Sequence, residues 1–306
     1  MSTAMEIVPL ARACGAEVRG VDVRALDDRG FAILHQAWLD HLVLVIPAQR
    51  LTDDDLTRFG QRFGVLDELP PVGQGQKPRD NPYISVISNV VENGVPIGGL
   101  ADDEVIWHSD TSYRERPPSA SLLHALELPA WGGNTGFANM YLALETLDPA
   151  LRQQVDRLSI KNDTTYNAGG QLREGFAPVT DVRNCPGAIH PIVRTHPETR
   201  HECLYLGRRR NAYVPGLEVE ASETLLDTLW QHATRDVLTW HHTWTIGDVV
   251  IWDNRCTMHR RDLFDPTTRR VMHRAQARDD LRPARDASAK NIPHPRGRTV
   301  VEALSA

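Results

Sequence analysis

Three residues far apart in the chain set the strongest limit on its fold: His108 and Asp110, separated only by Ser109, and the single His259. In an extended segment, residues two apart point to the same side, so His108 and Asp110 can reach one common point. His259 has to arrive from a distant strand, because three ligands on one short segment cannot surround an ion. If the three act together, both halves of the chain must meet, and we expect one domain over residues 1–306.

Two imidazoles and one carboxylate form the donor set that holds iron(II) on one face and leaves the opposite positions open. A His-x-Asp pair alone is a weak signal, because the two side chains could simply hydrogen-bond each other near a strand end. The same donors also suit zinc with a bound water, as in a metallohydrolase. A cupin-like binding module without turnover is a further alternative.

The motifs around these residues make the signal specific. They follow one another along nearly the whole chain, at Gly15–Asp22, Arg62–Gly64, Trp107–Asp110, Pro117–Pro118, Gly132–Thr135, His190–Pro197 and Trp252–Arg255. With them the chain resembles the taurine/2,4-dichlorophenoxyacetate dioxygenase (TauD/TfdA) family of iron(II)- and 2-oxoglutarate-dependent dioxygenases. The resemblance implies a mainly β fold with flanking helices, the double-stranded β-helix or jelly roll. It also implies Fe(II), with 2-oxoglutarate and O2 as cosubstrates, and hydroxylation with release of succinate and CO2.

The resemblance assigns His108, Asp110 and His259 to the metal and to catalysis. Arg270 lies eleven positions after His259, where this family places the arginine for the distal carboxylate of 2-oxoglutarate. A guanidinium suits that role because it offers a bidentate fork and stays charged. Thr135 matches the family threonine that adds a hydroxyl to the same carboxylate; the alternative is an ordinary strand residue after a Gly-Gly turn. Arg269 competes with Arg270, but neighbours on a strand point to opposite faces.

Arg274 should share a strand face with Arg270, and two inward arginines are costly without anionic partners. In the family, the position of Arg274 serves the acidic group of the primary substrate or the near carboxylate of 2-oxoglutarate. A salt bridge to a nearby Asp or Glu is the alternative. We expect Tyr113 to line the substrate pocket. The run Arg208–Arg210 predicts either a solvated face or a second contact for an anion.

The substrate itself is less constrained. Taurine-specific members have an asparagine four residues before the first iron histidine, where this chain has Glu104, and they have a histidine and a tyrosine after the Phe-Gly motif that residues 65–72 lack. We therefore do not expect taurine. A different sulfonate, a sulfate ester, an aryloxyalkanoate and a natural-product carboxylate all stay open.

Composition excludes several partners. The net charge of −6 gives no global basic field for nucleic acid or anionic membranes, and no stretch approaches the roughly 20 apolar residues that span a bilayer. The four cysteines are scattered without Cys-x-x-Cys spacing, which favours a reducing cytoplasm. We thus expect a cytoplasmic enzyme for a small anionic molecule, with no nucleic-acid or membrane partner. The family resemblance further implies that the protein forms a homo-oligomer, either a dimer or a tetramer.

The spacing of apolar residues along the chain predicts helices and strands. Strands are expected at 16–23 and 42–47, and helices at 26–41, 52–63, 141–158 and 222–234. Many short strands punctuated by Pro and Gly follow from residue 119 onward and favour a closed or double-sheet β architecture. Residues 67–80 predict an irregular loop, and 283–306 an irregular tail.

Overall fold

The structure is a computed structural model that describes residues 5–69, 80–100, 105–166, 170–286 and 288. Its α-helices are α1 (Asp28–His41), α2 (Asp53–Gly60), α3 (Met140–Glu145), α4 (Pro149–Val155) and α5 (Val219–Ala233). Short 3-10 helices occupy Val23–Ala25, Gln61–Phe63, Val182–Asn184 and Asp236–Leu238.

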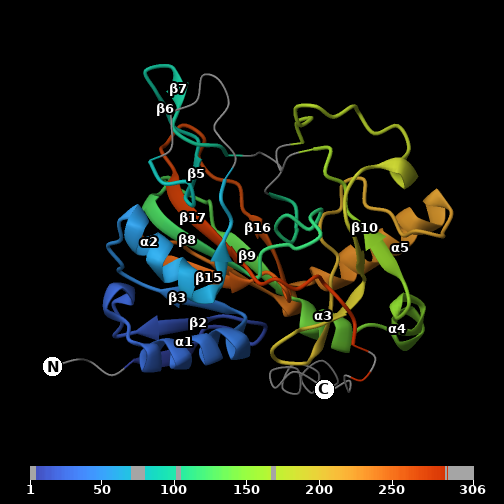
Figure 1. Ribbon diagram of the computed structural model, residues 1–306, viewed down its shortest axis with the longest axis horizontal. Helices are drawn as coiled ribbons and strands as arrows, with labels where there is room; N and C mark the ends of the chain where they lie inside the picture. The colour runs from blue at the N-terminus through green and yellow to red at the C-terminus, as the bar shows by residue number, and fades with distance from the viewer. Residues whose placement is uncertain (1–4, 70–79, 101–104, 167–169, 287, 289–306) are drawn as a thin grey trace.

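A large sheet forms one side of the molecule. Seven of its strands run in the order β1 (Glu6–Pro9), β2 (Ala16–Arg19), β3 (Val43–Ile46), β15 (Val249–Asp253), β8 (Ala120–Glu127), β17 (Val271–Arg278) and β4 (Val65–Leu66). The eighth strand, β5 (Ser85–Ser88), pairs with β17. The pairings are antiparallel except for β2 with β3. Neighbours along this sheet come from both ends of the chain, as the colours in Figure 1 show.

A smaller sheet carries the downstream half of the site. Its order is β14 (Thr239–His242), β9 (Thr135–Asn139) and β16 (Thr257–Arg261). Two-stranded pairs complete the β structure: β6 (Val91–Glu92) with β7 (Val95–Pro96), β10 (Ser159–Lys161) with β11 (Ile189–Pro191), and β12 (Val193–Thr195) with β13 (Glu202–Leu204). A mainly β fold with two sheets and flanking helices therefore agrees with the expectation.

The large sheet separates two apolar cores because successive side chains point to opposite faces. On β8, Leu122 packs into the cluster that contains Trp38 of α1 and Phe59 of α2. Its neighbour Leu123 packs into the other cluster, with Phe137 and Trp252. Figure 1 accordingly shows α1 and α2 on one side of the large sheet, and α3, α4 and α5 toward the other end of the molecule.

Local sequence explains where α2 begins. Thr52 is its N-cap: the Thr52 hydroxyl accepts the Asp55 amide hydrogen, and the Asp55 carboxylate accepts the Thr52 amide hydrogen. The single helix predicted over 141–158 was wrong. It is two helices, α3 and α4, because Pro149 has no N–H for a continuing helix and instead begins α4 behind the Asp148 cap.

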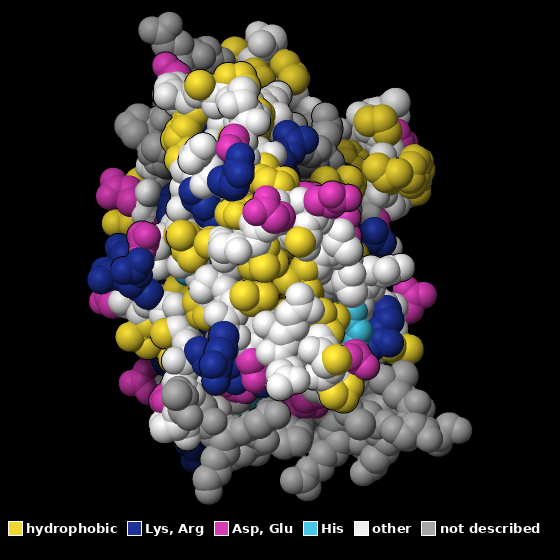
Figure 2. Space-filling view, turned by 90° about the vertical axis from the view of Figure 1, so that its right-hand side faces the viewer, with side chains coloured by type: hydrophobic (Ala, Val, Ile, Leu, Met, Phe, Trp, Pro, Cys, Tyr) yellow, Lys and Arg dark blue, Asp and Glu magenta, His cyan; other side chains and the backbone are white. Residues whose placement is uncertain are grey.

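The remaining expectations concern loops and surface. Most of the loop expected at 67–80 lies outside the described residues, and so does most of the expected tail, of which 283–286 form neither helix nor strand. Among the described helices, none combines the length and apolar character that a bilayer crossing requires. Figure 2 shows one face of the molecule, where Lys and Arg side chains alternate with Asp and Glu among apolar residues.

Candidate active site

His108, Asp110 and His259 meet in the interior, as the sequence predicted. Their ligand atoms all lie within 4.8 Å of one another, and all three residues are buried. The Nε2 atom of His259 lies 3.8 Å from Oδ2 of Asp110. The backbones of His108 and His259 exchange two hydrogen bonds, of 3.0 and 2.8 Å, so residue 108 pairs directly with β16.

The two histidines present ligand nitrogens to the same point. The Nδ1 atom of His108 lies 2.7 Å from the Ile106 carbonyl oxygen, which assigns the ring hydrogen to Nδ1 and leaves the lone pair on Nε2. The two imidazole centroids are 4.4 Å apart. Among the described residues, Nδ1 of His259 has no hydrogen-bond partner although it is buried. This donor set fits a divalent iron.

The protonation states of these three residues also suit metal binding. Burial lowers the pKa of His108 to about 3 and that of His259 to about 4. Burial alone would raise the pKa of Asp110, but His259 and the guanidinium of Arg274 outweigh it and hold this pKa below its usual range. Near neutral pH the site therefore offers two neutral imidazoles and one carboxylate, the forms that bind a metal.

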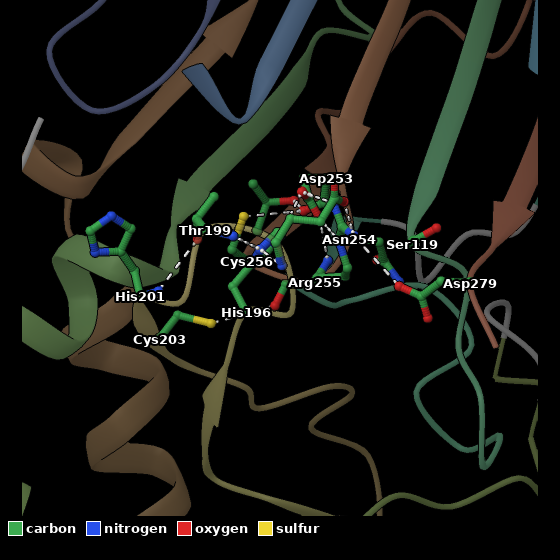
Figure 3. A network of polar contacts seen from close by, with 12 residues as sticks. Ser119, His196, Thr199, His201, Cys203, Asp253, Asn254, Arg255, Cys256 and Asp279 are labelled. Atoms are coloured by element: carbon green, nitrogen blue, oxygen red, sulfur yellow. Dashed lines mark hydrogen bonds and ion pairs between the residues drawn. The ribbon is translucent and has the colours of Figure 1, made fainter. Parts of the chain in front are cut away.

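The turn after β15 fixes the backbone of Asp110. The Asn254 side chain accepts the Asp110 amide hydrogen at 2.7 Å, and its amide group donates to the carbonyls of Asp110 and Pro118 at 3.1 and 2.9 Å. Asp253 and Arg255, on either side, form a buried ion pair at 2.7 Å (Figure 3). The Trp-Asp-Asn-Arg motif therefore positions Asp110, which lies 144 residues away from Asn254 in sequence.

A second buried cluster contains His196, Asp253 and Cys256. Both ring nitrogens of His196 are already used: Nδ1 accepts the Thr199 amide hydrogen at 3.1 Å, and Nε2 donates to Asp253 at 3.0 Å. Burial raises the pKa of the Cys256 thiol well above its ordinary value, which keeps sulfur protonated. This network, seen in Figure 3, is a structural support rather than a metal site.

Arg269 and Arg270 point to opposite sides, as strand alternation predicts. Arg269 is half exposed and pairs with Glu127 at 2.6 Å. Arg270 is 2% exposed and lines the same pocket as His108 and His259. Its backbone amide donates to the Asn89 side chain at 2.9 Å, which anchors the residue just before β17.

Thr135 lines this pocket too, at the start of β9. Its hydroxyl oxygen accepts the indole N–H of Trp244 at 3.0 Å. Since that bond uses a lone pair of the oxygen, the hydroxyl hydrogen can still be donated to another acceptor. Trp244 thus orients Thr135 toward the pocket.

Arg274 reaches the pocket from β17, on the same side as Arg270. Its Nη1 atom is 3.5 Å from Oδ1 of Asp110, so the alternative of a salt bridge to a nearby carboxylate is met in part by Asp110. The other carboxylate oxygen, Oδ2, accepts the Ser121 hydroxyl at 2.8 Å. Asp110 is therefore held from two sides.

Tyr113 is not among the described residues that line the pocket of His108 and His259. It is half-buried, its hydroxyl accepts from Arg173 at 2.7 Å, and the Arg173 guanidinium lies 4.5 Å from its ring centre. The Arg208 guanidinium lies 5.9 Å from the centre of the same ring, and Arg208 is close enough to lower the pKa of His108 and His259. Glu104 lies outside the described residues.

The arginine run divides in the structure. Arg209 pairs with Glu223 and Asp227 on α5, at 2.6 and 2.7 Å. Arg210 is exposed and donates to the Gly170 carbonyl at 3.0 Å. Of the three, Arg208 is the one whose charge reaches the triad histidines.

The chain as a whole has counterparts among known proteins. A family model described as "Taurine catabolism dioxygenase TauD, TfdA family" matches residues 6–276. The chain belongs to this family. The (S)-phenoxypropionate/alpha-ketoglutarate-dioxygenase of Delftia acidovorans is 34% identical to it over 293 residues, 89% of this chain and 94% of the relative.

Two further comparisons agree. Pentalenolactone F synthase of Streptomyces arenae is 32% identical over 285 residues, which cover 88% of this chain and 93% of the relative. The solved structure of AAD-2 with Mn(II) and N-oxalylglycine has a TM-score of 0.78 at 28% identity and covers 93% of this chain and 100% of that chain. The predicted jelly roll is confirmed. The protein is an iron(II)- and 2-oxoglutarate-dependent dioxygenase that acts on a small molecule with O2.

Sequence reasoning missed three contributors to the site of this dioxygenase: Ser121 on Asp110, Trp244 on Thr135, and Arg261 in the pocket wall. Arg261 carried a usable signal, since it follows His259 by two residues on a strand and must share its face. Ser121 and Trp244 carried none, because their partners lie on strands whose pairing no local pattern specifies.

Proposed function

We propose that His108, Asp110 and His259 hold the iron of this dioxygenase, and that Thr135 and Arg270 bind the distal carboxylate of 2-oxoglutarate. The iron supplies oxidation of the substrate coupled to decarboxylation of 2-oxoglutarate when it is bound. The buried arrangement of two neutral histidines and one ionised carboxylate carries this proposal. Arg270 and Thr135 support it because both line the same pocket.

We further propose that the primary substrate is a small organic anion and that Arg274 binds its acidic group. Arg274 lies beside Asp110 with a long contact of 3.5 Å, and its Nε–H is buried without an acceptor among the described residues. Leaving such a donor unsatisfied costs free energy that an incoming carboxylate, sulfonate or sulfate ester would recover. The apolar part of the wall, Ile87, Leu123 and Trp252, suits the body of an aryloxyalkanoate or a natural-product acid.

Tyr113 remains a proposal for the outer part of the substrate site. It lies against Arg173 and Arg208, and Arg208 lies near the triad. A substrate longer than the inner pocket would extend toward this group. Tyr113→Phe removes the hydroxyl that orients Arg173 but keeps the ring, so we expect a changed preference among substrates of different length rather than a loss of turnover.

The test begins with the reaction class. Fe(II) and 2-oxoglutarate added without oxygen should produce a weak visible absorption band, and substrates that enter the site should perturb it. A matched panel of phenoxypropionate, an alkylsulfonate, an alkyl sulfate and the neutral amide of phenoxypropionate is then assayed for succinate release. Efficient turnover of the neutral amide would contradict an anionic substrate.

The variant Arg274→Ala tests whether Arg274 binds the acidic group of the substrate. We expect a rise in KM for the substrate that exceeds the rise in KM for 2-oxoglutarate, and more 2-oxoglutarate decarboxylated without substrate oxidation, because the C–H bond is no longer held in place. Arg274→Lys should restore little, since an ammonium does not reproduce the planar fork. An effect of Arg274→Ala on 2-oxoglutarate alone would assign this arginine to the cosubstrate.

For the cellular setting we propose a cytoplasmic homo-oligomer, a dimer or tetramer, without nucleic-acid or membrane partners. The four cysteines are all buried and none is in a disulfide, which supports a reducing compartment. Sedimentation of the purified protein tests the oligomer, and a monomer at micromolar concentration would contradict it.

A further inference from the structure

Two buried polar side chains of the large sheet lie next to Asp110. They are Ser121 on β8 and Gln276 on β17, which stand directly opposite each other in the antiparallel pairing of these strands. Ser121 is fully buried and Gln276 is 8% exposed. Their neighbours along the two strands are the apolar residues Ala120, Leu122, Ala275 and Ala277. Because a buried polar group costs free energy unless it is hydrogen-bonded, the partners of this pair show what it does.

A chain of hydrogen bonds joins the pair to the carboxylate. The Gln276 amide nitrogen donates to Oγ of Ser121 at 3.0 Å, and the Ser121 hydroxyl donates to Oδ2 of Asp110 at 2.8 Å. An ionised carboxylate only accepts, so the single hydroxyl hydrogen of Ser121 must point to Asp110. Gln276 must then present its NH2 group to Ser121 rather than its oxygen. Ser121 and Gln276 together form a hydrogen-bond relay that ends on Asp110.

The relay supports a part of Asp110 that the turn after β15 does not. The Asn254 side chain bonds to the backbone amide and carbonyl of Asp110, so it does not restrain the carboxylate itself. The Ser121 bond does, because it sets where Oδ2 lies. A ligand that is already oriented loses little conformational freedom when a metal binds, and hydrogen bonds to a ligating carboxylate raise metal affinity.

Arg274 gives the relay a second effect. Its Nη1 atom lies 3.5 Å from Oδ1 of Asp110, which is a long contact for opposite charges. Asp110 is buried, and charges attract strongly where water is excluded, so a carboxylate that could turn freely would approach the guanidinium more closely. The Ser121 bond holds the other oxygen, Oδ2, and thereby resists this movement.

We propose that Ser121 and Gln276 are positioning residues, which hold the carboxylate of Asp110 for the metal and keep it from closing onto Arg274. The proposal rests on the metal site proposed above and adds to it two residues that act through Asp110. The relay leaves Asp110 to the metal and Arg274 to an anionic substrate. Loss of either relay residue should therefore lower metal affinity.

Ser119 provides a matched control. It precedes Ser121 by two residues, is 2% exposed, and its hydroxyl donates to the Ala277 carbonyl at 3.2 Å. Ser119→Ala and Ser121→Ala therefore each remove one buried hydroxyl and its hydrogen bond from the same part of the sheet. They differ in the acceptor, which is a backbone carbonyl for Ser119 and the Asp110 carboxylate for Ser121.

The experiment measures metal binding rather than turnover. Mn(II) is titrated into the protein without 2-oxoglutarate, electron paramagnetic resonance follows the free ion, and thermal unfolding is recorded without metal. Ser121→Ala should weaken Mn(II) binding about 10- to 100-fold, the range for residues that support a metal ligand. Gln276→Met keeps the side-chain length but loses the donor, so it should weaken binding about 2- to 10-fold, the loss of one neutral hydrogen bond. Ser119→Ala should lower the unfolding temperature as Ser121→Ala does, with Mn(II) affinity as in the parent protein.

A second comparison tests the competition with Arg274. Arg274→Met removes a positive charge beside the site, so it should tighten Mn(II) binding in the parent protein and in Ser121→Ala alike. The gain should be larger in Ser121→Ala, because only there can the carboxylate close onto the guanidinium. Equal gains would show that Arg274 acts on the metal through its charge alone, and would contradict the proposed separation of Asp110 from Arg274.

Three further outcomes would overturn the assignment. Unchanged Mn(II) affinity in Ser121→Ala, with a lowered unfolding temperature, would make Ser121 a purely structural residue. Full affinity in Gln276→Met would remove Gln276 from the positioning of Asp110. If His108→Ala binds Mn(II) as tightly as the parent protein, the proposed metal site itself is wrong, and that result is distinct because neither relay residue is changed in it.

Discussion

The described residues contain two buried clusters of metal-binding residue types, and the contrast between them supports the proposed site. His108, Asp110 and His259 form one, and His196, Asp253 and Cys256 form the other. Residue type, burial and proximity do not separate them. What separates them is whether the lone pairs that a metal needs are already used by the protein.

In the His196 cluster, hydrogen bonds within the protein already use these lone pairs. His196 accepts and donates through its two nitrogens, and Asp253 accepts from Arg255 and His196. In the His108 cluster the backbone and Asn254 orient the residues from behind, while Nε2 of each histidine points inward. Hydrogen bonds therefore occupy the ring nitrogens of His196 and the carboxylate of Asp253. In the His108 cluster they only orient the side chains, which leaves Nε2 of each histidine available for a metal.

The largest expected difference between the clusters is in metal binding. His108→Ala, Asp110→Ala and His259→Ala should each abolish iron-dependent turnover while leaving the fold largely intact, because these side chains line a cavity and bury little core surface. His196→Gln should retain one bound metal per chain and turnover. Metal content and succinate release measure both. Full activity in any triad variant with iron still bound one per chain would reject the triad, and metal loss in His196→Gln would join the two clusters into one functional unit.

Two adjacent arginines also differ in where their side chains lie. Arg269 is satisfied by Glu127, whereas Arg270 lies in the pocket. Arg270→Ala should lower the affinity for 2-oxoglutarate roughly 10- to 150-fold, because a hydrogen bond to a charged group contributes about 1.5–3 kcal/mol. Arg269→Ala should be mild, since exposed ion pairs contribute little. Titration of both variants with 2-oxoglutarate measures the difference, and a reversed order would mean that the strand presents the other face to the pocket.

The smallest expected effect is on acid stability, and it belongs to the His196 cluster. Burial lowers the pKa of His196 to about 4, whereas an unfolded histidine titrates near 6.5. Between these values the unfolded chain binds the proton first, so the folded state loses stability as the pH falls from about 6.5 toward 4. Between pH 7.5 and 5, the free energy of unfolding should therefore fall by roughly 2 kcal/mol more in the parent protein than in His196→Gln. Urea unfolding at the two pH values measures this, and equal losses would show that His196 does not titrate in this range.

Several elements and site residues of this protein were predictable from short stretches of sequence, because capping, apolar patterning and strand alternation act between near neighbours in the chain. The capping residue Thr52 and the apolar run at 42–47 predicted α2 and β3 within a few residues. The His-x-Asp pair put two ligands on one side of an extended segment, and alternation separated Arg269 from Arg270. Pro149 should have divided the helix predicted over 141–158, but apolar spacing on both sides of it concealed the break.

The sequence by itself determined which donors exist and which side of a strand carries each one. Only the tertiary structure decided which donors keep a free lone pair. Asn254 holds Asp110, Trp244 orients Thr135 and Asp253 accepts the hydrogen bond of His196, each across 57 to 144 residues of chain. The reason is physical: a hydrogen bond between two strands depends on their register, and register follows from packing of the whole sheet rather than from any one segment.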